Sequence, residues 1–172
     1  LGTPVPAVIG TDMEGLAAEL EYVTGIPSFG IDTTGFSTYV SGICKAFDLM
    51  LNMLDQVPQA NNRKPFVNVL GMTPLDLSIE SDRQLDQLLA SEGIPVGVHL
   101  FMGACEDTLE LLPHAVCNVA VSYAGLLMAQ NLQKRFGTPY ISCSFTASQE
   151  ASKEFAAMRA LIAGKELEPH KA

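Results

Sequence analysis

Two short loops carry the residue types best suited to chemistry. The first, residues 102–107, places Gly103 and Cys105 among other small or acidic residues, and the second, residues 122–125, begins with Ser122 and Tyr123. Small residues let the main chain approach a ligand closely, and a thiol near a helix N-terminus ionises more readily than a free one. We therefore expect Cys105 to be the thiol that contacts a ligand.

Classical catalytic motifs are absent, so catalytic residues stay unassigned. Ser122 is not part of a GxSxG nucleophile motif. The three histidines, His99, His114 and His170, fall in a strand pattern, a loop and the tail, and none is expected to face Ser122 as a base.

Two further turns are typical of ordinary structure. Residues 10–15 read Gly-Thr-Asp-Met-Glu-Gly, which is not the GxGxxG pattern of dinucleotide-binding turns. Residues 32–35 read Asp-Thr-Thr-Gly, but an aspartic dyad needs two such turns in an all-β protein and this chain has one. We interpret the first as a glycine turn with Thr11 or Asp12 as a helix N-cap, and the second as an ordinary turn.

The four cysteines do not predict a metal site in this chain. Cys44, Cys105, Cys117 and Cys143 form no CxxC pair and no cluster of zinc-ligand spacing. Isolated cysteines flanked by apolar residues usually pack as small hydrophobes in a reducing compartment. The sequence therefore favours a cytoplasmic protein.

Composition excludes several classes of protein. The chain has 172 residues, 48% of them hydrophobic, and a net charge of −9. An acidic chain lacks the clustered lysines and arginines that nucleic-acid binding needs. Because no apolar run approaches the ~18 residues of a membrane span, we expect a soluble protein with neither a nucleic-acid nor a membrane partner.

Short apolar runs alternate with helical patterns, which predicts an α/β fold. Such strands are buried on both faces, so the fold class is a doubly wound, mostly parallel sheet with helices on both faces, Rossmann-like or flavodoxin-like. The expected strands are 5–10, 28–31, 66–70, 96–101, 116–121 and 140–143, and the expected helices are 13–23, 37–54, 81–91, 108–112, 123–136 and 148–163.

The polar, turn-rich stretch 58–65 is the best domain boundary. It separates an N-terminal βαβα lobe, residues 1–57, from a Rossmann-like α/β domain, residues 66–164. Residues 165–172 are expected to form a frayed tail.

Ligands of open parallel sheets bind at the carboxyl ends of the strands. That rule selects the loops after the strands, and we expect residues 71–78, 102–107 and 122–125 to form one crevice. The cofactor-binding residues predicted there are Gly71, Gly103, Cys105, Ser122 and Tyr123.

Several motifs, taken together, resemble nitrogenase component 1. These are Val-Ile-Gly-Thr-Asp at 8–12, Asn-Val-Leu-Gly at 68–71, Ala-Val-Ser-Tyr at 120–123 and Lys-Arg-Phe-Gly-Thr-Pro-Tyr at 134–140. The family includes the molybdenum–iron protein subunits, their cofactor-assembly relatives and the tetrapyrrole reductases. The resemblance covers nearly the whole chain.

The resemblance implies a fragment of a larger oxidoreductase subunit, and Leu1 in place of an initiating Met agrees with this. In this family an ATP-dependent iron–sulfur reductase passes electrons to a metallocluster, and a homologous subunit is the usual partner. No cofactor is expected on the fragment alone. An iron–sulfur or related metallocluster would be supplied in part by missing regions of the full-length protein.

Two departures from the family pattern argue against dinitrogen reduction. The cofactor cysteine of the nitrogenase α-subunit aligns with Ser122, and the bridging-cluster cysteine would fall near Pro4, where there is none. Iron–sulfur cofactors need thiolate ligands. Two alternatives stay open: a small-ligand-binding α/β module without catalysis, and a purely structural half of a heterodimer.

Overall fold

The computed structural model describes residues 4–31, 35–52, 54, 64–75, 78–100, 106–143 and 148–164. The chain divides into two compact units, Leu1–Asp55 and Gln56–Ala172. Most of the expected boundary stretch 58–65 and the whole tail 165–172 lie outside the described residues, so the domain bounds drawn from the sequence stay predictions.

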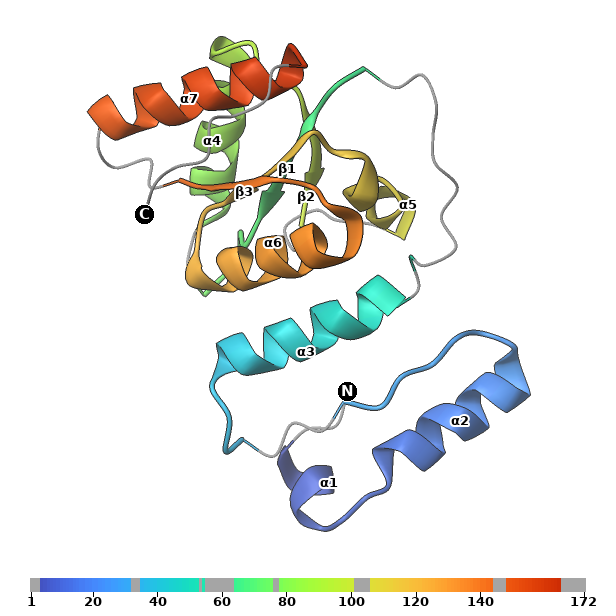
Figure 1. Ribbon diagram of the computed structural model, residues 1–172. Coiled ribbons are helices and arrows are strands. Elements are labelled where there is room, and N and C mark those ends of the chain that lie inside the picture. The colour runs from blue at the N-terminus through green and yellow to red at the C-terminus, as the bar shows by residue number, and fades with distance from the viewer. Residues whose placement is uncertain are drawn as a thin grey trace. The chain divides into compact units, whose positions relative to one another are not determined.

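A four-stranded parallel sheet is the framework of the second unit (Figure 1). Its strands are β1 (Val67–Leu70), β2 (Val96–His99), β3 (Cys117–Ala120) and β4 (Tyr140–Ser142), in the order β2-β1-β3-β4. Every residue of the two central strands β1 and β3 is buried. Burial on both faces explains why these strands read as apolar runs without alternation.

Helices cover both faces of the sheet, which confirms the doubly wound fold (Figure 1). Helices α4 (Ile79–Ser91) and α7 (Ser148–Ile162) lie on one face, and α6 (Tyr123–Phe136) lies on the other. The short α5 (Glu106–Leu109) and the 3₁₀ turn η2 (Leu112–His114) connect β2 to β3. Capping residues set the ends of α6, since the Ser122 hydroxyl accepts from the Gly125 N–H and Gly137, at φ 75°, ends the helix.

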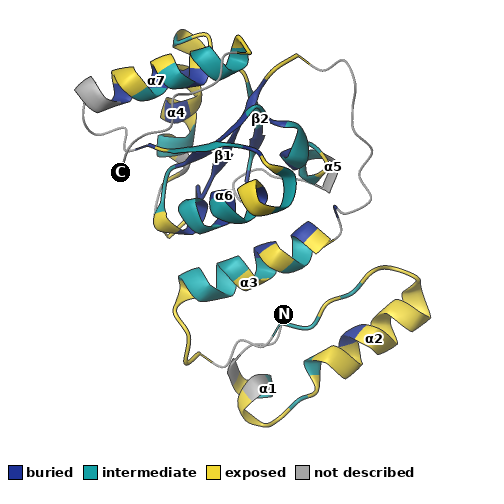
Figure 2. Cartoon of the chain, in the orientation of Figure 1, coloured by how far each residue is buried: buried dark blue, intermediate teal, exposed yellow. Residues whose placement is uncertain are grey.

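The main core lies between the sheet and the α4–α7 layer (Figure 2). Side chains at alternate strand positions point to this face and meet apolar residues of both helices. The buried members of this core are Val67, Val69, Met72, Leu85, Leu89, Ile94, Cys117, Val119, Cys143, Ala151, Phe155 and Met158.

A buried amide pair occupies the opposite face of the two central strands. Asn68 and Asn118 face each other in register on β1 and β3, and both are fully buried. The Asn68 Nδ2 group donates to Asn118 Oδ1 at 2.8 Å and to the Leu112 carbonyl at 3.0 Å. These bonds link the two strands to each other and to η2. Burying an amide without hydrogen bonds is costly, so they favour this arrangement.

The first unit is helical in its described part. It contains α1 (Pro4–Val8), α2 (Met13–Thr24) and α3 (Tyr39–Asn52). As the sequence predicts, α2 begins after the Asp12 cap, whose carboxylate accepts from the Gly15 N–H at 2.8 Å, and it ends at Gly25.

The two strands expected in this unit are wrong. Residues 4–8 form a helix, and residues 28–31 are irregular. Pro4 and Pro6 fall in the first turn of α1, where main-chain N–H groups have no partner within the helix, whereas Pro6 would break a strand ladder. Gly30 packs against the start of α2, where a Cβ would lie 2.5 Å from the Met13 carbonyl oxygen.

Helix α2 leaves most of its expected apolar stripe exposed. Only Ala17 is buried among its residues, whereas Leu16, Leu20 and Val23 are exposed.

Among the described residues, none of the helices combines the length and the apolar character that a membrane span requires.

The Asn68→Ala variant should lose about 2–3 kcal/mol of unfolding free energy. The substitution removes the donor to Asn118 and to the Leu112 carbonyl and leaves both acceptors buried. Urea unfolding of the full chain measures this loss, with Gln84→Ala on exposed α4 as the control. A loss no larger than that of the control would contradict a structural role for the amide pair.

Candidate functional site

The strand order reverses between the carboxyl ends of β1 and β3, where the sequence predicts a crevice. We call this position the β1–β3 crevice. From β1 the chain moves outward to β2 and then crosses back over to β3 and β4. The segments that leave β1 and β3 therefore run to opposite sides of the sheet, which is where open parallel sheets bind ligands. Gly71 follows β1 and Ser122 precedes α6, so both predicted residues lie at this point.

Gly71 and Ser122 pack directly against each other. Gly71 has a φ of +91°, and a Cβ there would lie 2.3 Å from Ser122 Oγ and 2.6 Å from the Gly125 nitrogen. No side chain fits in that space, and L-residues rarely adopt that backbone conformation. Glycine is therefore the residue that this position demands.

Gly125 makes the matching contact from α6. A Cβ at Gly125 would lie 2.1 Å from the Leu70 carbonyl oxygen, which accepts the Val121 N–H at 3.1 Å. The first turn of α6 consequently rests on the end of β1. Gly125 was not among the residues predicted for the site. A glycine three positions after Ser122 is the signal in the sequence, since it suits a helix that starts against a strand.

Ser122 and Tyr123 differ in what they offer a ligand. The Ser122 hydroxyl accepts a hydrogen bond from the Gly125 N–H at 3.2 Å, as the N-cap of α6. Tyr123, the first residue of that helix, is 67% exposed. Tyr123 can therefore contact a ligand, whereas Ser122 has a structural task.

The other two predicted residues cannot be placed. Gly103 and Cys105 lie outside the described residues, and their roles stay predictions. In the loop after β1, Met72 and Thr73 are buried and Leu75 is exposed.

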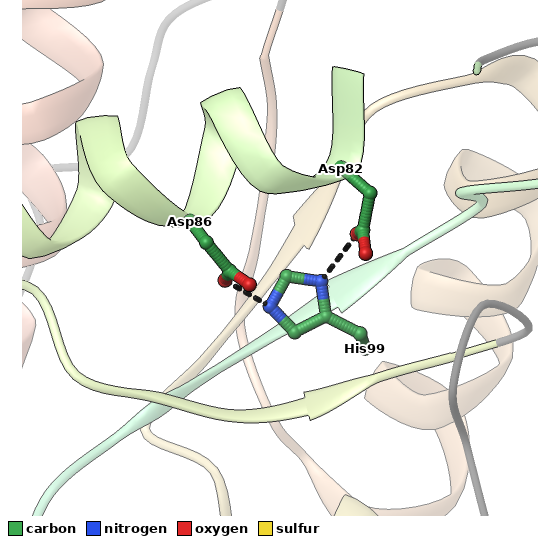
Figure 3. Close-up of side chains that lie close together, drawn as sticks. All are labelled: Asp82, Asp86 and His99. Atoms are coloured by element: carbon green, nitrogen blue, oxygen red, sulfur yellow. Dashed lines mark hydrogen bonds and ion pairs between the residues drawn. The ribbon is translucent and has the colours of Figure 1, made fainter. Parts of the chain in front are cut away.

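A second polar constellation, which the sequence analysis missed, lies where β2 ends (Figure 3). His99 Nδ1 is 3.0 Å from Asp82 Oδ1, and His99 Nε2 is 2.7 Å from Asp86 Oδ1. The expected strand 96–101 ran two residues too far, because β2 ends at His99. The sequence pattern that could have revealed this site is a pair of aspartates four residues apart in a predicted helix, followed by a histidine near the end of the next strand.

The thiols of the described residues do not fit an iron–sulfur cluster. Burial raises the pKa of Cys117 to about 12, and burial together with the Glu154 carboxylate raises the pKa of Cys143. Burial also raises the pKa of Cys44, with a smaller effect from Asp48. Clusters bind thiolates, and the described residues bring no group of cysteines together.

The sequence profile of one protein family, described as nitrogenase component 1 type oxidoreductase, matches residues 1–171. Among curated relatives, a light-independent protochlorophyllide reductase subunit from Crocosphaera subtropica is 36% identical over 89 residues, 51% of this chain and 18% of the relative. The corresponding relative from Prosthecochloris aestuarii is 37% identical over 87 residues, 49% of this chain and 16% of the relative.

Solved structures show a similar fold. One described as nitrogenase Cp1 at pH 5 matches 91% of this chain and 34% of its own, with a TM-score of 0.64 and 20% identity. A second, at pH 6.5, matches 96% of this chain and 40% of its own, with a TM-score of 0.64 and 17% identity. The chain thus spans only a part of the proteins it matches.

The Gly125→Ala variant should lose about 2–3 kcal/mol of unfolding free energy, because its methyl group would overlap the Leu70 carbonyl and push α6 away from β1. Urea unfolding measures the loss. Gln133→Ala, at an exposed position of the same helix, should change stability by less than about 0.5 kcal/mol. Equal stability of the two variants would show that α6 does not need to approach β1 this closely.

Proposed function

Because the chain belongs to the nitrogenase component 1 type oxidoreductase family, we propose that it is part of a reductase subunit whose substrate binds at the β1–β3 crevice. The observation that carries the proposal is the close packing of Gly71, Ser122 and Gly125 where the strand order reverses. That packing fixes the start of α6, and with it the exposed Tyr123, at the point where the strand order reverses.

The substrate class proposed is a planar, conjugated macrocycle of the tetrapyrrole type. The names of the relatives, light-independent protochlorophyllide reductase subunits, support this choice. The exposed ring of Tyr123 offers a flat ligand a surface for stacking.

Dinitrogen reduction is not part of the proposal. Ser122 stands where the resemblance to the nitrogenase α-subunit calls for a cofactor thiolate, and its hydroxyl accepts a hydrogen bond from Gly125. A neutral hydroxyl in that role is a poor ligand for an iron–sulfur cofactor.

A metallocluster in the intact protein needs ligands from outside the described residues of this chain. The protonated and scattered thiols of the described residues do not supply them. We propose that the ligands come from other parts of the intact subunit and from a homologous partner subunit, and that an ATP-dependent iron–sulfur reductase supplies the electrons. A cytoplasmic location belongs to the same proposal.

A binding module without catalysis is the second candidate. Within the described residues, the crevice presents glycine main chain, a capping hydroxyl and a phenol, with no acid–base pair directed at it. Such a site can hold a ligand without transforming it.

Iron content separates the two candidates. The full-length gene product, purified without oxygen together with its partner subunit, should contain stoichiometric iron and show broad visible absorbance. Iron quantitation and absorption spectroscopy measure this. A colourless, iron-free complex that binds a tetrapyrrole without turnover would contradict the reductase and favour the binding module.

The Tyr123→Ala variant should bind a tetrapyrrole about two- to twelvefold more weakly, because aromatic stacking contributes about 0.5–1.5 kcal/mol. Absorbance titration of the full-length protein with protochlorophyllide measures the affinity. Tyr22→Ala, which removes an exposed tyrosine of the first unit, is the matched control. Equal affinities of the two variants would place the ligand away from the β1–β3 crevice.

A further inference from the structure

His99 lies between two carboxylates at the carboxyl end of the edge strand β2 (Figure 3). Asp82 and Asp86 are one turn apart on α4 and reach the imidazole from opposite sides. The side chains of His99 and Asp82 are 17% and 21% exposed, and that of Asp86 is 52% exposed. Two regular elements therefore hold the constellation, with its Asp86 side open to solvent.

The two ring nitrogens of His99 have different surroundings. Nδ1 forms a hydrogen bond with Asp82 Oδ1 at 3.0 Å, in which Nδ1–H is the donor because an ionised carboxylate only accepts. Nε2 is buried and has no hydrogen-bond partner, although Asp86 Oδ1 lies 2.7 Å away.

With the ring proton on Nδ1, Nε2 and the Asp86 oxygen are two lone-pair donors 2.7 Å apart with no hydrogen bond between them. A divalent cation bound by both atoms would satisfy both of them.

We propose that His99 Nε2 and the Asp86 carboxylate bind a divalent transition cation of the Zn²⁺ class. Metal–nitrogen and metal–oxygen bonds of about 2.0–2.2 Å place the two ligand atoms of a tetrahedral site about 3.3–3.6 Å apart, so the 2.7 Å separation seen here would widen by less than about 1 Å on binding. The Asp86 side chain is half exposed, so it can move away from His99 by the required distance. One donor atom from each of Asp82, Asp86 and His99 lies within 4.8 Å of the other two.

Asp82 is the positioning residue of this site. A carboxylate that accepts the other ring N–H of a metal-binding histidine fixes its tautomer and its orientation, and the Asp82–Nδ1 hydrogen bond has that geometry. Imidazole with carboxylate suits zinc, iron or cobalt, whereas Mg²⁺ prefers oxygen ligands alone.

A cation held by these two ligands would have its remaining coordination positions on the half-exposed Asp86 side. Asp86 also lines an open groove along the edge of the sheet, with Ala90, Gly93, Ile94, Pro95 and Val96. Water or an anionic ligand can occupy those positions. The cation site involves neither Tyr123 nor the β1–β3 crevice, so it does not rest on the function proposed above.

Calorimetric titration of the full chain, stripped with chelator, with ZnCl₂ at pH 7.5 tests the site. We expect one Zn²⁺ per chain and no binding of Mg²⁺. The His99→Gln and Asp86→Asn variants should each bind Zn²⁺ at least tenfold more weakly, and Asp82→Asn should do so by about tenfold. Co²⁺ should give visible absorbance that H99Q loses.

The controls are His114→Gln and Glu110→Gln, which remove an imidazole and a carboxylate from outside the site and should leave Zn²⁺ affinity unchanged. Circular dichroism verifies that each variant folds, and the half-exposed Asp86 is the substitution least dependent on packing. Wild-type protein that binds no Zn²⁺ would overturn the site. Binding that survives both H99Q and D86N would overturn it as well.

Discussion

The contact between the end of β1 and the first turn of α6 is the constraint on which the carboxyl edge of this domain depends. Two main-chain segments approach so closely that neither Gly71 nor Gly125 has room for a side chain. The Ser122 cap and the Leu70 carbonyl complete the contact. Because α6 starts there, its exposed first residue, Tyr123, stands beside the point where the strand order reverses.

Both candidate sites lie at the carboxyl edge of the same sheet, but they use different chemistry. The β1–β3 crevice offers main chain and an aromatic ring, which suit a flat organic ligand. The end of β2 offers an imidazole between two carboxylates, which suits a cation. A parallel sheet directs all its strand ends to one edge, so unrelated sites can arise there without any change in the core.

The family of this chain and the state of its thiols indicate different roles for this segment and for the rest of the assembly. The fold matches nitrogenase structures over most of this chain but over only 34–40% of theirs. Cys117 and Cys143 are buried core residues of the α4–α7 layer, and burial raises the pKa of both thiols. Under the proposed function, this segment contributes scaffold and ligand surface, and cluster ligands come from the larger assembly.

Local signals in the sequence were enough for most of the helices, the cap at Asp12 and the four strands of the sheet, because burial periodicity and capping follow from nearby residues. The capping role of Ser122 and its close approach to Gly71 came from the structure. Residues 4–8 were misjudged, since a short apolar run does not distinguish helix from strand. The Asn68–Asn118 pair and the contacts of Asp82 and Asp86 with His99 were decided by the tertiary structure alone. Each joins residues that are 13 to 50 positions apart, and only the strand order and the side on which α4 packs bring such residues together.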